Sequence, residues 1–308
     1  MKSKRLFLYP CSILLALTIS SCGASFNRSN DSNKPSNNED SSSVNNTSNG
    51  GEQISSSANP GTSNTSSSSK ESGSSYVPDT GDKQIYLITE STLDKGTYDA
   101  SKDEYTFTVS GSYKQIYVNV PDKVLTVELD GATITNSENS PIYVAACDEI
   151  DFSAKKNTTN VVRDSRAAYT EDVDEQGKGA IYVEDGDLKL KGTGTLNIYG
   201  NYLNGIHAKD DVKIQKLTLN VEAINHGIRG NDSVTITSGT INISCGGDGL
   251  HSENSDVSSK GNQKGNVTVN GGDLTINSWG DAIQAAYDAI IDQTDSSVTT
   301  SIVAKTNK

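Results

Sequence analysis

Seven side chains recur at one position of a repeated sequence unit and have the chemistry of a sugar-binding surface. Each follows the apolar residue that opens a unit, as in Ile116-Tyr117-Val118. Tyrosine rings offer flat faces to pyranose rings, whereas arginine and histidine donate hydrogen bonds to hydroxyl groups or uronate carboxylates. The candidate binding residues are Tyr117, Tyr143, Tyr182, His207, Arg229, His251 and Gln284. The alternative is that they are ordinary outward residues of a sheet, which tyrosine columns also stabilise.

The histidines in this set predict a pH-dependent preference among sugars. Unperturbed histidine titrates near ~6.5, so His207 and His251 should gain charge as the pH falls toward about 6. We therefore expect the histidine and arginine end of the column to favour uronates. The tyrosine end should favour neutral chains by stacking.

A second column offers ligands to a metal ion. It comprises the residues just before each unit opens, which are Asn204, His226, Asp248 and Asp281. Ca²⁺ takes six to eight oxygen ligands, and the acidic residues at the next corner, Asp210, Asp211 and Asp232, could supply more. We expect calcium ligands among Asp248, Asp281, Glu253 and Asp210. The structural alternative stays open, because aspartate and asparagine before glycine are ordinary turn residues.

Catalysis has less support from the residues. A lyase acting on polyuronate needs a base beside calcium, for which Arg229 with His251 and Asp248 is the best available arrangement. A glycosidase needs two carboxylates that face each other across a groove, whereas Asp248 and Asp281 are neighbours within one column. We assign no catalytic residue and expect binding rather than turnover.

These columns exist only if the chain repeats at a fixed period. Gly205, Gly227 and Gly249 are 22 residues apart, and the pattern restarts at Asp281, 33 residues after Asp248. The extra residues lie in the polar stretch 254–263, which predicts a loop that protrudes from one coil. A regular period of this kind is typical of solenoid proteins.

The units themselves read as short strands. Apolar and polar residues alternate and are interrupted by Asp, Asn or Gly, while residues 83–280 show no sustained helical period. A unit of about 22 residues cannot bury its own apolar face, but stacked units can pair at ~4.8 Å and enclose a continuous core. The sequence therefore predicts an all-β, right-handed parallel β-helix over residues 81–308. A β-sandwich is the main rival, but sandwiches do not repeat at a fixed period.

The first residues predict export and a lipid anchor. Lys2, Lys4 and Arg5 precede an apolar stretch that is too short to span a membrane. The sequence that ends at Cys22 resembles the lipobox of bacterial lipoproteins. This resemblance implies a signal peptide over residues 1–21, lipidation of Cys22, and a location on the extracellular face of the bacterial cell membrane. Residues 22–80 are rich in Ser and Asn and should form a disordered linker.

Charge and cysteine content narrow the partners. The formal net charge is −13, which argues against nucleic acid and against an anionic lipid surface. We expect membrane attachment through the N-terminal lipid only, and a monomer. Beyond the signal peptide and Cys22, the chain has only Cys147 and Cys245. Both lie in strand-like stretches, so buried free thiols are expected.

The segments Asn204-Gly-Ile-His-Ala-Lys-Asp-Asp-Val, His226-Gly-Ile-Arg-Gly-Asn-Asp-Ser-Val and Gly247-Asp-Gly-Leu resemble a clostridial family of carbohydrate-binding parallel β-helix proteins. The resemblance spans residues 83–290 and implies a fold similar to that of calcium-dependent pectate lyases. It also implies bound calcium and binding of cellulose and acidic plant sugars. Asn204 and His226 stand where the family usually has aspartate.

Together these features predict a surface-displayed, non-catalytic protein that binds polysaccharide, such as cellulose or polygalacturonate-like chains, and is stabilised by Ca²⁺. Two alternatives remain open. One is a calcium-dependent lyase acting on polyuronates, which would release unsaturated products. The other is a structural surface protein or adhesin, which would bind no insoluble polysaccharide.

Overall fold

The computed structural model describes residues 76–169, 178–292 and the strand 299–302. All of these belong to one compact unit, Ser67–Lys308. The predicted signal peptide, Cys22 and most of the predicted linker lie outside the described residues. No helix among the described residues is both long and apolar enough to cross a membrane.

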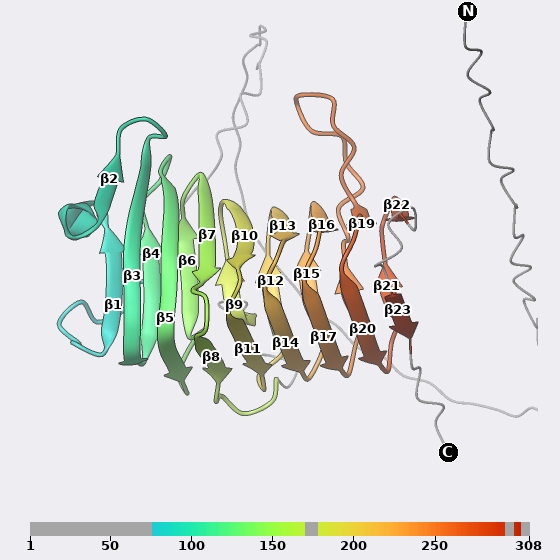
Figure 1. Cartoon of the computed structure of the whole chain (residues 1–308), viewed down its shortest axis with the longest axis horizontal. Coiled ribbons are helices and arrows are strands. Elements are labelled where there is room, and N and C mark those ends of the chain that lie inside the picture. The colour runs from blue at the N-terminus through green and yellow to red at the C-terminus, as the bar shows by residue number, and fades with distance from the viewer. Residues whose placement is uncertain (1–75, 170–177, 293–298, 303–308) are drawn as a thin grey trace, which may run out of the picture. The chain divides into compact units, whose positions relative to one another are not determined.

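Two sheets wind along this unit as stacked coils (Figure 1). Within the described residues the first sheet has 8 strands that pair in parallel, one strand from each successive coil. In spatial order these are β1 (Ile85–Thr89), β4 (Gln115–Asn119), β6 (Ile142–Ala146), β9 (Gly179–Val183), β12 (Asn204–Ala208), β15 (Ile228–Gly230), β18 (Leu250–His251) and β21 (Ile283–Gln284).

The second sheet has two arms that share the long strand β5 (Val124–Asn136). The first half of β5 pairs with β7 and its second half pairs with β8. One arm contains β7 (Glu149–Ala154), β10 (Asp187–Gly192), β13 (Asp211–Ile214), β16 (Ser233–Ile236), β19 (Asn266–Val269) and β22 (Asp288–Ile291). The other contains β8 (Thr159–Asp164), β11 (Thr195–Gly200), β14 (Thr218–Ala223), β17 (Thr240–Cys245), β20 (Asp273–Ser278) and β23 (Thr299–Ile302).

The core follows from the predicted period. Ile206, Ile228 and Leu250 pair in one column and are fully buried, because each is the inward residue of its strand. Ile283 continues the column in the last coil, where it is partly exposed. The coils therefore bury a continuous aliphatic interior, and the prediction of a parallel β-helix is confirmed.

Two parts of the described chain depart from the regular coils: the segment that follows β1 and the loop between β18 and β19. The short 3₁₀ helix Glu90–Lys95 follows β1, and β2 (Thr97–Asp99) forms an antiparallel pair with β3 (Glu104–Tyr113). The predicted loop extends from the stack between β18 and β19 (Figure 1). The thiols of Cys147 and Cys245 are free and buried, as expected.

Candidate functional site

The seven predicted binding residues form one continuous column on the outer face of the first sheet. Each pairs in register with the next residue of the set, from one coil to the following one. The order is Tyr117, Tyr143, Tyr182, His207, Arg229, His251 and Gln284. The register predicted from the repeat is confirmed, and the exposure of the side chains separates the two ends of the column.

The tyrosine end of the column is covered. Tyr117, Tyr143 and Tyr182 are only 3%, 0% and 3% exposed. Tyr76 lies against this end, with its ring 4.9 Å from that of Tyr143 and 6.0 Å from that of Tyr117. The expectation that these rings present open faces to sugars is therefore wrong, because Tyr76 and neighbouring apolar side chains bury them. Part of the range predicted as a linker thus contacts the folded unit.

His207 is also buried, next to Tyr182. Burial, together with the nearby charge of Arg229, lowers the pKa of His207 to about 3. The expectation that this histidine gains charge near pH 6 is wrong for a physical reason: a buried imidazole loses the hydration that stabilises its charged form.

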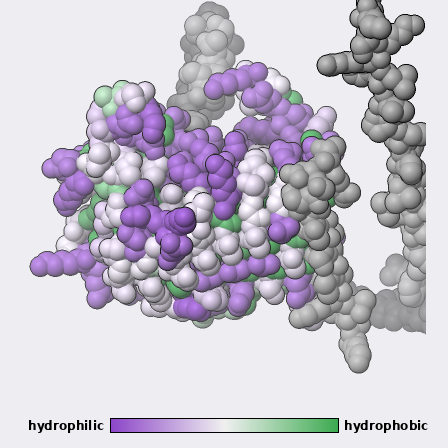
Figure 2. Space-filling view, viewed as in Figure 1, coloured by the Kyte–Doolittle hydropathy of each residue, from purple (hydrophilic) through white to green (hydrophobic). Residues whose placement is uncertain are grey.

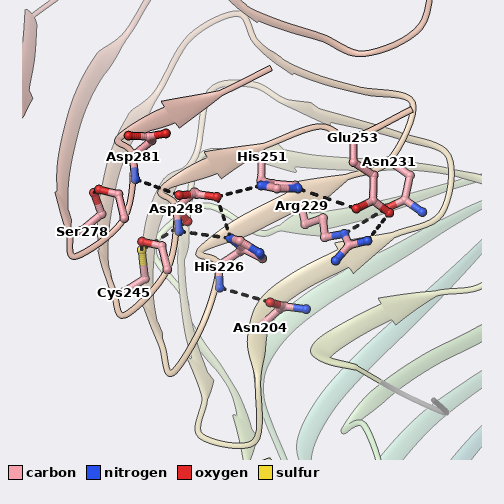
Figure 3. A network of polar contacts seen from close by, with 12 residues as sticks. Asn204, His226, Arg229, Asn231, Cys245, Asp248, His251, Glu253, Ser278 and Asp281 are labelled. Atoms are coloured by element: carbon pink, nitrogen blue, oxygen red, sulfur yellow. Dashed lines mark hydrogen bonds and ion pairs between the residues drawn. The ribbon is translucent and has the colours of Figure 1, made fainter. Parts of the chain in front are cut away.

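Arg229 and Gln284 are partly exposed at the other end of the column, with the buried His251 between them, and side chains of two successive coils join Arg229 and His251 in a network (Figure 3). Nε of Arg229 donates to Oδ1 of Asn231 at 3.0 Å, and its guanidinium pairs with Glu253. Nδ1 of His251 lies 2.8 Å from Oδ2 of Asp248. The predicted binding residues and metal ligands therefore meet in one polar network at this end.

The second predicted column links successive coils through its side chains. Oδ1 of Asn204 accepts the backbone N–H of His226 at 3.1 Å. Nδ1 of His226 in turn accepts the N–H of Asp248 at 3.0 Å, and Oδ1 of Asp248 accepts that of Asp281 at 2.7 Å. Asn204, His226 and Asp248 thus have a structural role, since each satisfies a backbone donor of the next coil.

The glycines that follow this column let the coils approach one another. A Cβ on Gly227 would lie 2.4 Å from Cγ2 of Ile243 and 2.8 Å from the carbonyl oxygen of Gly249. Neither distance is compatible with a side chain. The recurrence of glycine at a 22-residue spacing therefore has a steric cause.

His226 is held as a neutral ring. Burial and the neighbouring His251 lower its pKa to about 4, against the raising influence of Asp248. The two imidazole rings lie 4.2 Å apart and are tilted by 32°. Nδ1 of each ring faces the same oxygen, Oδ2 of Asp248, at 3.2 and 2.8 Å.

The predicted calcium ligands are divided between two places. Asp248, Asp281 and Glu253 lie around His226 and His251 (Figure 3), where two nitrogen atoms stand among the oxygen atoms. This donor set does not suit Ca²⁺, which prefers oxygen alone. Asp210 lies in the turn between β12 and β13, where its Oδ2 accepts the N–H of Gly186 at 3.1 Å.

The turn that holds Asp210 is an acidic corner, defined here by Asp187, Asp210 and Asp211. Desolvation, together with the charges of Asp211 and Asp210, raises the pKa of Asp187 to about 6. Neighbouring negative charges of this kind attract a cation, and the donors are all oxygen. The acidic corner therefore fits calcium better than the surroundings of Asp248 do.

The acidic corner opens onto a groove of about 320 Å³ that crosses β7, β10, β13 and β16. Charged groups of both signs line it, including Glu149, Asp187, Lys189, Asp211 and Lys213. We did not predict Glu149, Asp187 or the lysines as site residues. The repeat could have identified Asp187, because it precedes Asp211 by about one coil. It could not have identified Glu149, which precedes Asp187 by an interval that does not match the repeat.

The other arm carries a second groove of about 370 Å³, called the neutral groove here because Glu222 is the one charged residue among the described residues that line it. A ladder of amides runs along it, with Asn242 donating to Asn220 at 2.9 Å and Asn220 donating to Asn197 at 2.8 Å. Tyr199 also lines this groove, and the guanidinium of Arg163 lies 3.7 Å from the centre of its ring. The groove combines hydrogen-bonding amides with a partly exposed aromatic ring.

The fold and its polar outer grooves place the chain in the class of parallel β-helix proteins, for which solved structures are known. The chain is similar to the polysaccharide lyase-like protein from C. thermocellum, solved as a gadolinium derivative. The TM-score is 0.55 at 27% sequence identity, and the match covers 71% of this chain and 91% of that one.

The family follows from the sequence match. The model of the carbohydrate-binding domain-containing protein family matches residues 95–308, and the chain belongs to this family. A carbohydrate-binding domain-containing protein of Acetivibrio thermocellus is 33% identical over 121 residues, which is 39% of this chain. The matched region spans 42% of the length of that relative.

Proposed function

We propose that the protein is a non-catalytic polysaccharide-binding protein. In this proposal acidic sugar chains bind in the groove across β7, β10, β13 and β16. The observation that carries this proposal is a row of carboxylates across the coils of that groove, with two paired lysines beside it: Glu149, Asp187 and Asp211, and Lys189 and Lys213. A uronate chain lying across the coils would meet Lys213, which can pair with its carboxylates directly, whereas Lys189 already pairs with Glu149 and Asp151. It would also meet acidic side chains that reach it through a shared cation.

Calcium in this proposal belongs to the acidic corner. Desolvation and the neighbouring charges of Asp211 and Asp210 both raise the pKa of Asp187, so the ionised form is disfavoured there. A bound Ca²⁺ would neutralise these carboxylates, stabilise the fold and present an open coordination position to a uronate carboxylate. Lys264 partly compensates the neighbouring charge, since it pairs with Asp232 beside the corner.

Neutral chains such as cellulose would use the second groove instead. Amide side chains there can donate to and accept from hydroxyl groups, and Tyr199 can stack on a sugar ring. The surface in Figure 2 supports this polar mode of binding, because hydrophobic residues are scattered there among hydrophilic and neutral ones.

The lyase alternative depends on finding a base in the first groove. Lys189 lies there, but its hydrogen bonds to Glu149 and Asp151 outweigh the effect of burial, and its pKa is raised. A lysine that holds its proton more tightly is a poorer base. The groove therefore favours binding over proton abstraction.

The setting of this function rests on the first residues of the chain. A lipid on Cys22 would hold the domain at the extracellular face of the bacterial membrane, at the end of the predicted linker. We propose that the protein acts there as a monomer and contacts the membrane through this lipid only.

The direct test is a binding assay on insoluble polygalacturonate and cellulose, with calcium and with chelator. We expect calcium-dependent retention on polygalacturonate, and Lys213→Ala to reduce it. The control is Lys156→Ala, which removes an exposed lysine outside the groove. Equal retention of both variants would contradict the groove assignment. A rise in ultraviolet absorbance from unsaturated uronides would select the lyase instead.

A further inference from the structure

We propose that His226, Asp248 and His251 form a binding site for a divalent transition-metal ion of the zinc class. The three residues come from the ends of two successive coils and converge on the outer face of the first sheet (Figure 3). One ligand atom from each of them lies within 4.8 Å of the others. The site is separate from the acidic corner and does not depend on glycan binding.

The spacing of the ligand atoms matches that of a coordination shell. Oδ2 of Asp248 is 3.2 Å from Nδ1 of His226 and 2.8 Å from Nδ1 of His251. Zinc binds nitrogen and oxygen at about 2.0–2.2 Å, which places neighbouring ligands roughly 2.9 to 3.4 Å apart in octahedral or tetrahedral geometry. Both distances are therefore close to those of an ion-binding arrangement.

A metal ion at this site would take over the one lone pair at Nδ1 of His226, which now accepts a backbone hydrogen bond. The backbone N–H of Asp248 donates to Nδ1 of His226, so this nitrogen carries no hydrogen. The same atom lies 3.2 Å from Oδ2 of Asp248, which is also an acceptor. Two acceptors at this distance repel each other, and a cation between them would turn the repulsion into attraction.

His251 can become a ligand without gaining charge. Its Nδ1 now lies in hydrogen-bond contact with Oδ2 of Asp248, and the hydrogen must come from the ring because a carboxylate only accepts. A metal ion would replace this proton, and the neutral ring would carry its hydrogen on Nε2. Oε2 of Glu253 lies 3.8 Å from Nε2 and could orient the ring, as outer carboxylates do at histidine–metal sites.

Charge and access also suit a dication. Asp248 and Glu253 bring two carboxylates to the network, against the single guanidinium of Arg229, and Asp281 joins it through its backbone N–H. The side chains of His226, Asp248 and His251 are 10–16% exposed, so solvent reaches them. Mixed imidazole and carboxylate ligands are typical of zinc and similar ions, whereas calcium prefers oxygen alone.

The repeat supplies conservative variants for the test. Asn204 occupies the position of His226 one coil earlier and still accepts the next backbone N–H, so His226→Asn should keep the fold and lose the ligand. Gln284 occupies the position of His251 one coil later, which makes His251→Gln the matching change. The chain has 3 histidines, and His207→Gln is the control that leaves the site intact.

The experiment is equilibrium dialysis of the whole, metal-free chain against Zn²⁺, together with Co²⁺ titration followed by visible absorption. We expect one Zn²⁺ per chain that millimolar Ca²⁺ does not displace, and ligand-field bands with Co²⁺. His226→Asn and His251→Gln should each weaken Zn²⁺ binding by more than about tenfold, while His207→Gln binds as the unchanged chain does.

Two results would overturn the proposal. One is the absence of stoichiometric Zn²⁺ binding by the folded, unchanged chain. The other is unchanged Zn²⁺ affinity in the folded His226→Asn and His251→Gln variants. Asp187→Asn separates this site from the acidic corner, since it should alter calcium binding and leave Zn²⁺ affinity as it is.

Discussion

Nδ1 of His226 accepts a hydrogen bond from the backbone N–H of Asp248, 3.0 Å away and one coil later. Asn204 and Asp248 play the same part for the residues that follow them in the column. The column thus fastens each coil to the next beyond the hydrogen bonds of the strands. It also fixes the orientation of the side chains that meet around Asp248.

Replacing Ile228 by Asp should unfold the neighbouring coils. Ile228 is fully buried, and an unpaired charge in that position costs several kcal/mol. Far-UV circular dichroism and thermal unfolding would show a large loss. The control is Ile224→Asp in the same coil, where the side chain is 51% exposed and the melting temperature should change little. Equal melting of both variants would contradict the column of buried residues.

Removing the Tyr76 ring should uncover the tyrosine end of the first column. The ring contacts Tyr117 and Tyr143, so Tyr76→Ala should lower the free energy of unfolding by about 1 to 3 kcal/mol. It should also increase quenching of tyrosine fluorescence by acrylamide. Tyr98→Ala is the control, because Tyr98 is 48% exposed and belongs to the β2–β3 pair. Unchanged quenching would show that Tyr76 does not cover these rings.

Asp187→Asn should stabilise the metal-free protein at neutral pH. The folded state raises the pKa of Asp187 from 3.8 to about 6, so it holds the proton more tightly than the unfolded chain does. The ionised group therefore destabilises the fold above about pH 6, and this cost disappears as the pH falls toward 3.8. In chelator at pH 7.5 we expect a gain of about 1 kcal/mol after solvent screening, shrinking at pH 4. A gain that does not depend on pH would contradict this origin.

Calcium should raise the melting temperature of the unchanged chain, because an ion that binds only the native state stabilises it. Millimolar Ca²⁺ should increase the melting temperature and chelator should reverse the change. Asp187→Asn and Asp210→Asn should each reduce this shift, whereas Asp281→Asn should leave it nearly unchanged. If only Asp281→Asn reduced the calcium-dependent shift in melting temperature, the calcium site would lie around Asp248 instead of at the acidic corner.

Arg229→Ala should affect binding of acidic sugars only slightly. The guanidinium is occupied by Glu253 and Asn231, so it is less available to a uronate than an unpaired arginine would be. Tyr199→Ala should reduce retention on cellulose by removing the partly exposed ring of the neutral groove. Loss of polygalacturonate binding in Arg229→Ala would instead indicate that acidic sugars bind to the column that contains Arg229 and His251.

The repeat was sufficient to predict which residues share a column. Ile206 pairs with Ile228, and His207 with Arg229, because a fixed 22-residue period converts directly into strand register. Exposure could not be predicted in the same way. The cover over Tyr143 comes from Tyr76, which precedes the first coil and has no counterpart in the repeat. The role of Asp187 was missed because its raised pKa depends on carboxylates brought together from separate turns.

The column of Asn204, His226, Asp248 and Asp281 has an evolutionary consequence. Three different side chains in it perform the same structural task, since the amide, the imidazole and the carboxylate each accept the next backbone N–H. Natural selection can therefore exchange them without rebuilding the scaffold. Each exchange alters the hardness, charge and proton affinity of the atoms displayed on the surface. Duplicating a coil would extend the series by about 4.8 Å, so the architecture can acquire new ion preferences one repeat at a time.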